Sequence, residues 1–327
     1  MVKPLSALAA GLLLCGQMTG IAVAQSDYPA HTITMIVPFA AGGPTDVVGR
    51  IVAASMSRKL GQQIVIENVI GAGGTTAGTR AMRAAPDGYT IILGHMGTHA
   101  AAVALYPKLA YNPSTDFAPI GLVAGMPVVV LTRKDVPAQN LGEFTTYAKK
   151  HAAELTMAHA GVGSVSYVTC ELFNSILGLK PKLISYQGTG PAMYALVSGR
   201  VDYMCDQVVT VVPQVLPGNI KVLMVGTPKR NPALPDVPTA TEAGLPQFQA
   251  SAWNALFAPK NTPQPIISRL NAALVAALDD ESVRQPLKEL GGDIPDLAGR
   301  SPNALAALVK SEIAKWTPIL KAGEPTN

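Results

Sequence analysis

The sequence carries little charge and little cysteine. Only 14% of its 327 residues are charged while 48% are hydrophobic, and this balance argues against disorder. The net charge is only +4, and no run of lysine and arginine suits a phosphate backbone, so we expect no nucleic-acid partner. Beyond the N-terminal leader no segment offers about 18 uninterrupted apolar residues, so we expect no membrane-spanning helix.

Catalytic motifs are also missing. The chain has no G-x-S-x-G elbow, no S-x-x-K and no H-E-x-x-H, so no motif supplies its serines with an activating partner. The glycine-rich segments are not nucleotide motifs, because no glycine turn is followed by Lys-Ser/Thr and Thr76 replaces the third glycine of G-x-G-x-x-G. We therefore expect a protein that is not an enzyme and carries no cofactor, with a periplasmic hydrolase as an alternative.

The first 24 residues are typical of a signal peptide. Lys3 precedes an apolar stretch from Leu8 to Leu14, and Ala22-Val23-Ala24 fits a signal-peptidase site. We therefore expect residues 1–24 to be removed and the mature chain to begin at Gln25. Such a protein is exported, and we expect it in the periplasm.

Two of the three cysteines, Cys170 and Cys205, lie beyond this leader. They are too few for a cysteine-rich zinc site. In an exported protein they either form one disulfide or remain buried free thiols, and their spacing does not decide between the two. His95 and His99 have the i, i+4 spacing of a metal site, but no glutamate accompanies them as in H-E-x-x-H, so we expect no bound metal.

Short apolar runs alternate with longer amphipathic segments along the chain. Strands that alternate with helices indicate an α/β fold with mainly parallel sheets flanked by helices. The apolar runs predict strands at Thr32–Phe39, Gln63–Val69, Tyr89–Gly94, Ile120–Thr132, Leu155–Ala160, Lys182–Tyr186, Val201–Cys205, Ile220–Gly226 and Ser251–Ala258. The C-terminal helical segments carry one apolar face, which we expect to pack onto the first domain.

One apolar segment is twice as long as an ordinary strand. It runs from Ala118 to Thr132 with Gly125 and Pro127 in its middle, which predicts one strand ending and another starting in a second domain. A return crossing is expected at Trp253 to Pro259. Two crossings imply a hinge between two domains. We expect residues 25–125 plus 250–327 to form domain 1 and residues 126–249 to form domain 2.

Two junctions repeat one pattern, in which a strand runs into a glycine turn, a hydroxyl or acid, and a helix. They are Pro38–Asp46 in the first domain and Ala158–Ser166 in the second. Free N–H groups at a helix start can hold an anion, so two such ends facing across a hinge would grip a carboxylate from both sides. Plain helix capping is the alternative. The arrangement recurs at Gly71–Thr76 and Gln187–Gly190, where ligands of open α/β sheets gather.

An ordered set of motifs resembles a known family over essentially the whole mature chain. The motifs are Val37–Asp46, Glu67-Asn68 to Gly74, Pro86–Tyr89, Asp116–Ile120 and Leu234–Thr239. They look like the substrate receptors of tripartite tricarboxylate transporters, the Bug family. The sequence departs from the family pattern at Val69-Ile70, where Arg-Pro is common, and at Cys205, where an aromatic residue is frequent.

The resemblance implies a two-domain Venus-flytrap periplasmic binding protein of type II-like architecture. Such a protein captures a small carboxylate, a di- or tricarboxylate or an aromatic acid, and delivers it to membrane transporter subunits. A sensory adaptor, which would bind the same ligand but signal to a membrane receptor, is an alternative. We expect a monomer.

The expected ligand-binding residues come from both domains. The resemblance implies that the loop from Phe39 to Asp46 contacts ligand partly through water and that the loop from Gly161 to Ser166 binds a carboxylate. Asp206 either accepts hydrogen bonds from the ligand or caps a helix, and Thr98 with His99 either contacts the ligand or caps a loop. The full set is Phe39, Gly42, Gly43, Thr45, Asp46, Thr98, His99, Val162, Gly163, Ser164, Val165, Ser166, Gln187, Gly188 and Asp206.

Overall fold

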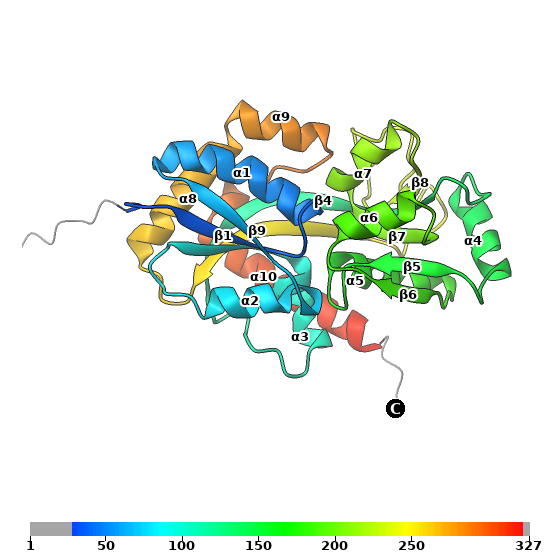
Figure 1. The fold of residues 1–327 in the computed structure, drawn as a ribbon, viewed down its shortest axis with the longest axis horizontal. Helices are drawn as coiled ribbons and strands as arrows, with labels where there is room; N and C mark the ends of the chain where they lie inside the picture. The colour runs from blue at the N-terminus through cyan, green and yellow to red at the C-terminus, as the bar shows by residue number, and fades with distance from the viewer. Residues whose placement is uncertain (1–27, 323–327) are drawn as a thin grey trace, which may run out of the picture.

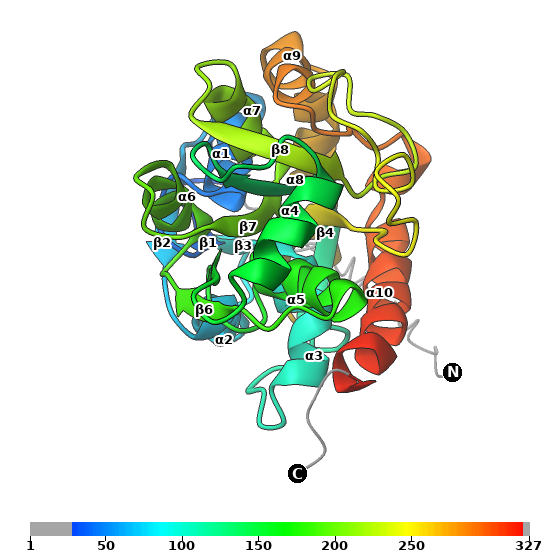
Figure 2. The ribbon, with the colours of Figure 1, turned by 90° about the vertical axis from the view of Figure 1, so that its right-hand side faces the viewer.

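The computed structural model describes residues 28–322, which form two α/β lobes side by side (Figure 1). The expected signal peptide, residues 1–24, lies outside these residues. Within the described range no helix combines the length and the apolar character needed to cross a membrane. Figure 2 views the molecule from the second lobe, with α4 and α5 toward the viewer.

The first lobe is built on three parallel strands. The strand β1 (Ile33–Pro38) pairs with β2 (Ile64–Val69) on one side and β3 (Thr90–His95) on the other, and β9 (Ser251–Pro259) runs antiparallel to β3. The apolar residues of β1, β3 and β9 are almost completely buried, because helices cover the sheet. The helices of this lobe are α1 (Pro44–Leu60), α2 (Thr75–Met82), α3 (Ala102–Leu105), α8 (Gln264–Leu278), α9 (Glu281–Glu289) and α10 (Pro302–Ala322).

The second lobe repeats the design on a smaller scale. The strand β5 (Thr156–His159) pairs in parallel with β6 (Lys182–Ser185) and β7 (Tyr203–Gln207), and β8 (Ile220–Val225) follows in the chain. The helices of this lobe are α4 (Leu141–Lys150), α5 (Val165–Leu177), α6 (Thr189–Val197) and α7 (Val208–Val215). Apart from the long segment that joins the lobes, each expected strand is therefore present within a few residues of its predicted bounds.

The two lobes share one long strand, β4 (Phe117–Arg133). It pairs antiparallel with β9 as far as Pro127, and from Val128 onward it pairs antiparallel with β7 and β8. The prediction of two separate strands was wrong, because Pro127 does not interrupt the strand: it stands at the last pair of one ladder, where a missing N–H is tolerated. The sheet is therefore mixed, with parallel strands in each lobe and antiparallel strands where they join.

The C-terminal helix α10 packs along β4 and α3. Glu312 on this helix accepts hydrogen bonds from the indole Nε1 of Trp253 at 3.2 Å and of Trp316 at 3.1 Å. Both indoles are buried. The expected packing of the C-terminal apolar face onto the first lobe is confirmed.

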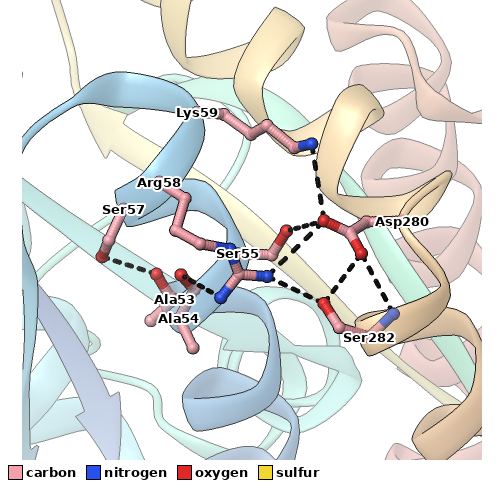
Figure 3. Close-up of polar contacts among 8 residues, drawn as sticks. All are labelled: Ala53, Ala54, Ser55, Ser57, Arg58, Lys59, Asp280 and Ser282. Atoms are coloured by element: carbon pink, nitrogen blue, oxygen red, sulfur yellow. Dashed lines mark hydrogen bonds and ion pairs between the residues drawn. The ribbon is translucent and has the colours of Figure 1, made fainter.

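A cluster of polar side chains fixes α9 to α1 (Figure 3). Asp280 caps α9 by accepting from the N–H and the hydroxyl of Ser282, at 3.0 and 2.8 Å, and it also accepts from the buried hydroxyl of Ser55 at 3.1 Å. These hydrogen bonds hold the pKa of Asp280 well below its usual range. The ammonium of Lys59 lies 3.4 Å from the same carboxylate.

The chain after α9 provides a further link between the lobes. The side-chain amide of Asn231, in the second lobe, donates to the carbonyl of Gly291 at 2.8 Å. Two residues on, the N–H of Asp293 donates to the carbonyl of Gly125 in β4 at 2.9 Å. Because α9 is fixed to α1, the hydrogen bond between Asn231 and Gly291 connects these first-lobe helices to the second lobe.

Cys170 and Cys205 form a disulfide, with their Cα atoms 5.4 Å apart. The bond joins α5 to β7 inside the second lobe, and both residues are completely buried. It settles the alternative between a disulfide and free thiols that spacing left open. It also holds together the two elements whose ends line the cavity described next.

Candidate functional site

A small cavity lies between the lobes, at the carboxyl ends of β1, β3, β5 and β7. Its volume is about 20 Å³, which has room for about one water molecule. The helices α1, α5, α6 and α7 begin around it. The residues that line it are Pro38, Phe39, Ala40, Gly43, Pro44, Thr45, Asp46, His95, Ala160, Ser164, Val165, Ser166, Thr189, Asp206 and Gln207.

The cavity is small because the lobes are closed on each other. The N–H of Ala40 in the first lobe donates to the carbonyl of Gln187 in the second at 2.9 Å. The hydroxyl of Tyr106 lies 2.7 Å from the carbonyl oxygen of Val162. Gly73 approaches the same carbonyl so closely that a Cβ on Gly73 would lie 1.7 Å from it. Any ligand larger than water therefore enters only when these contacts open.

Phe39 separates the cavity from a wider hollow at the seam between the lobes. Its backbone has a positive φ of 74°, which a side chain tolerates only at a cost of about 1–2 kcal/mol and which often marks a functional site. The N–H of Phe39 donates to the Val69 carbonyl at 3.2 Å, and its ring stacks on His95 with centroids 5.3 Å apart. The outer hollow measures about 860 Å³, and Tyr186 and Gln187 are among its lining residues.

The first-lobe junction contains a negatively charged side chain. Asp46, in the first turn of α1, accepts from the Gly42 N–H at 3.0 Å, from the Arg50 guanidinium at 2.8 Å and from the Asn68 amide at 3.0 Å. Burial by itself would raise the pKa of Asp46, but the hydrogen bonds from Arg50, Gly42 and Asn68 outweigh it and lower the pKa. The N-terminus of α1 is thus already neutralised by an ionised side chain.

The second-lobe junction has no such acid. Ser164 caps α5 by accepting from the Tyr167 N–H at 3.2 Å, and its hydroxyl donates to the Gly161 carbonyl at 2.7 Å. Val165 and Ser166 follow, and N–H groups at this position of a helix lie outside its own hydrogen-bonding pattern. The first turn of α5 contains no acidic residue. Its N-terminus is therefore the electropositive end that remains open to an anion in the cavity.

Asp206 lines the cavity on the side of the second lobe. Its carboxyl accepts from the Gln207 N–H at 2.8 Å and from the Thr210 hydroxyl at 2.7 Å. Burial raises the pKa of Asp206 to about 7, in spite of these hydrogen bonds and one from Thr189. Asp206 directly precedes α7, accepts from the N–H of its N-cap residue Gln207, and also lines the cavity. Its contact with a ligand stays a prediction.

The two histidines after β3 have different surroundings. His95 lines the cavity, and its Nδ1 accepts from the Gly97 N–H at 2.9 Å. His99 stacks on Phe257 with centroids 4.1 Å apart, and its Nδ1 lies 2.9 Å from the Thr98 hydroxyl. Burial lowers the pKa of both histidines to about 3, so both are neutral at physiological pH.

The structure divides the expected site residues into three groups. Those that line the cavity are Phe39, Gly43, Thr45, Asp46, Ser164, Val165, Ser166 and Asp206. Those that surround it in the seam or the adjoining loops are Gly42, Val162, Gly163, Gln187 and Gly188. Thr98 and His99 face the first-lobe core, because a π-helical turn at Gly97–Ala101 carries them away from the end of β3.

Several cavity residues were not among the expected ones. His95 is the clearest case, since it was considered only as a metal ligand. Its place at the last position of a strand is the signal that identifies it. The others are Pro38, Ala40, Pro44, Ala160, Thr189 and Gln207. Over residues 28–322 no group of three or more histidine, cysteine, aspartate and glutamate residues could hold a metal ion.

Comparisons with known proteins identify the family and the fold. Residues 48–324 match the model of the tripartite tricarboxylate transporter family receptor. A UPF0065 protein of Agrobacterium vitis is 41% identical over 94% of this chain and 89% of its own length. The structure of MatC from Rhodopseudomonas palustris with bound malate is 52% identical, with a TM-score of 0.87 over 90% of this chain and 100% of that one. The periplasmic binding protein BugD is 41% identical, with a TM-score of 0.88 over 90% and 98%.

Proposed function

The chain belongs to the tripartite tricarboxylate transporter receptor family, and on this premise we propose that it captures a small dicarboxylate and delivers it to a tripartite tricarboxylate-type membrane transporter. Members of the family are periplasmic solute-binding receptors and not enzymes, which sets the hydrolase alternative aside. The observation that supports a carboxylate ligand is the open N-terminus of α5. Its cap Ser164 and its first-turn residues Val165 and Ser166 line the cavity.

The size of the ligand is inferred from a related structure and from the residues that bound the cavity. MatC, which is 52% identical to this chain, holds malate, and this supports a short dicarboxylate here. One carboxylate binds the N–H groups of Val165 and Ser166, and the rest of the molecule extends toward Phe39 and His95. Aromatic acids and larger tricarboxylates are less favourable, because Phe39 bounds the cavity on the side of the outer hollow.

Entry requires the lobes to separate. Residues 25–125 plus 250–327 and residues 126–249 act as two domains that turn about the two connecting segments. The partner change of β4 between Pro127 and Val128 supports the first pivot, and the return of the chain into β9 at Ser251 supports the second. Closure then buries the ligand against helix N-termini, which gives selectivity without turnover.

The capture step is tested by calorimetric titration and thermal shift of the exported protein with malate, succinate, citrate and benzoate. A dicarboxylate that binds at one site raises the melting temperature by mass action. We expect a shift with malate at millimolar concentration and a smaller one or none with benzoate. If no carboxylate shifts the melting temperature, the proposal fails.

Delivery is tested separately in cells. A strain that contains the cognate large and small membrane components should take up the dicarboxylate only when this chain is also produced. Uptake that does not depend on the chain would contradict delivery while leaving capture intact. The protein is expected to act as a monomer, which sedimentation with and without ligand would check.

A further inference from the structure

Two buried polar atoms, one on a residue that lines the cavity and one on its neighbour in the next strand, have no hydrogen-bond partner among the described residues. They are Nε2 of His95 and Oδ1 of Asn254. The two residues are direct partners across the antiparallel pair of β3 and β9, so their side chains lie on the same face of the sheet. Both residues are buried, with exposed fractions of 1% for His95 and 0% for Asn254. A buried polar group without a partner costs free energy, so a bound group that forms hydrogen bonds with both atoms would be favourable.

The neighbours of each side chain determine what the two atoms offer. Nδ1 of His95 accepts from the Gly97 N–H at 2.9 Å, so the proton of the neutral ring is on Nε2, which is a donor. Burial lowers the pKa of His95, so the ring stays neutral. The amide nitrogen of Asn254 donates to Oε1 of Gln207 at 3.2 Å, which leaves Oδ1 as an acceptor.

His95 lines the cavity, and Asn254 is its direct partner on β9. The ring of His95 is held between Phe39, on which it stacks, and Gly97, where a Cβ would lie 2.7 Å from the ring. Asn254 does not line the closed cavity itself, but it donates to Gln207, which does. The pair lies on the first lobe, across the cavity from the N-terminus of α5.

We propose that His95 and Asn254 recognise a hydroxyl group, so that the ligand of the proposed function is a 2-hydroxy dicarboxylate. A hydroxyl accepts from Nε2–H of His95 and donates to Oδ1 of Asn254, and thereby satisfies both atoms at once. An ionised carboxylate has no proton for Asn254, and a methylene group satisfies neither atom. The inference rests on the proposed function, because it assumes a dicarboxylate whose first carboxylate is at α5.

Malate and succinate are the decisive pair of ligands, because they have the same chain length and differ by one hydroxyl. Calorimetric titration of the wild-type protein with both acids, and with each enantiomer of malate, gives the hydroxyl preference as a ratio of dissociation constants. We expect one enantiomer of malate to bind at least about tenfold more tightly than succinate, which corresponds to about 1.4 kcal/mol. A water shared by the two atoms would instead give equal affinities and overturn the inference.

Two variants connect the preference to the named atoms. His95→Phe keeps a ring against Phe39 but removes the donor, and Asn254→Leu removes the acceptor. Each should reduce the ratio to below about threefold while changing succinate affinity much less. The partly exposed His151, at the C-terminal end of α4, supplies the matched control, since His151→Gln should leave the ratio unchanged.

The outcomes separate the two proposals. A ratio that stays at its wild-type value in both variants overturns the assignment of His95 and Asn254. If His95→Phe does not fold, the wild-type ratio and Asn254→Leu still decide. If the wild-type protein binds neither acid, it is the proposed function that fails, since the hydroxyl inference concerns only the difference between them.

Discussion

The helices α1 and α5 begin on opposite sides of the cavity, each after a glycine turn, but their N-termini are satisfied in different ways. The start of α1 is occupied by the carboxylate of Asp46, which Gly42, Arg50 and Asn68 hold in place. The start of α5 is capped by the neutral hydroxyl of Ser164, and no acid lies in its first turn. One acidic residue in the first turn thus puts a negative charge at the start of α1, where α5 has none.

The same contrast appears in the two carboxyl groups that line the cavity. In the first lobe, hydrogen bonds and the Arg50 charge outweigh burial and lower the pKa of Asp46. In the second lobe, burial raises the pKa of Asp206 to about 7. Burial thus disfavours the charged form of Asp206, which lowers the repulsion that a carboxylate bound at the second lobe would meet.

The disulfide is the largest difference between the lobes that can be removed. Cys170→Ala with Cys205→Ala opens a loop of 35 residues and should lower the free energy of unfolding by about 4 kcal/mol. Denaturant unfolding measures this change. Reductant should destabilise the wild type and leave the double variant unaffected. A loss below about 1 kcal/mol would show that α5 and β7 are held by packing alone.

The opposite pKa shifts predict opposite effects of pH on stability. The raised pKa of Asp206 stabilises the wild type fully below about pH 4, and this contribution is lost as pH rises to about 7. Asp206→Asn should therefore gain stability relative to wild type over this range, by about 2–4 kcal/mol. The lowered pKa of Asp46 gives a contribution that is present above about pH 4 and lost below it, so Asp46→Asn should lose stability relative to wild type as pH rises through this region.

Denaturant unfolding of the three proteins between pH 3 and pH 8 checks both signs. Differences from wild type are compared because buried His95 and His99, whose pKa values are lowered, add an opposing slope common to all three. Parallel curves for Asp206→Asn and wild type would contradict the account of Asp206.

Closure of the lobes can be blocked at one backbone position. Gly73→Ala places a methyl group against the Val162 carbonyl of the other lobe and should weaken dicarboxylate binding by about 100-fold. Gly61→Ala is the matched control, since Gly61 has a similar positive φ of 74° and no neighbour within 4 Å of an added Cβ. Both changes carry the same type of backbone strain, so equal affinities in calorimetry would exclude a role for closure at Gly73.

The two junctions should respond in opposite directions to loss of their polar side chains. Ser164→Ala together with Ser166→Ala removes the cap of α5 and the Ser166 hydroxyl that accepts from the Ala160 N–H, and should weaken carboxylate binding about tenfold. The fold should persist, as measured by circular dichroism. Unchanged affinity would remove this loop from the site.

A smaller effect of opposite sign is expected at the other junction. Asp46→Asn removes a negative charge from the cavity wall and exposes the N-terminus of α1, so carboxylate affinity should rise about threefold at low salt. Weaker binding by this variant would mean that Asp46 positions the ligand and does not oppose it.

The sequence was sufficient for most of the strands, because apolar runs and glycine junctions are local patterns. It failed at β4, where Gly125 and Pro127 suggested a break although the strand is continuous. A proline interrupts a strand only if its N–H is needed, and that depends on which strand lies beside it. The pairing partner is not a local property, so local patterns did not reveal it.

The site was predicted less completely than the fold. Glycine junctions identified the two loops, but their sequences did not reveal that Asp46 would close one of them, which depends on Asn68 of the neighbouring strand. Thr98 and His99 were expected at the cleft, yet one π-helical turn directs them into the core and leaves His95 at the cavity. The direction of a side chain after a strand depends on the first turn that follows it, and a periodic pattern does not reveal this.

The most direct test of the difference between the lobes is a crystal structure of the protein with a bound dicarboxylate. The account predicts one carboxylate within hydrogen-bond distance of the N–H groups of Val165 and Ser166, with the Asp46–Arg50 pair intact. A carboxylate bound at the start of α1, with Asp46 displaced and the N-terminus of α5 empty, would contradict it.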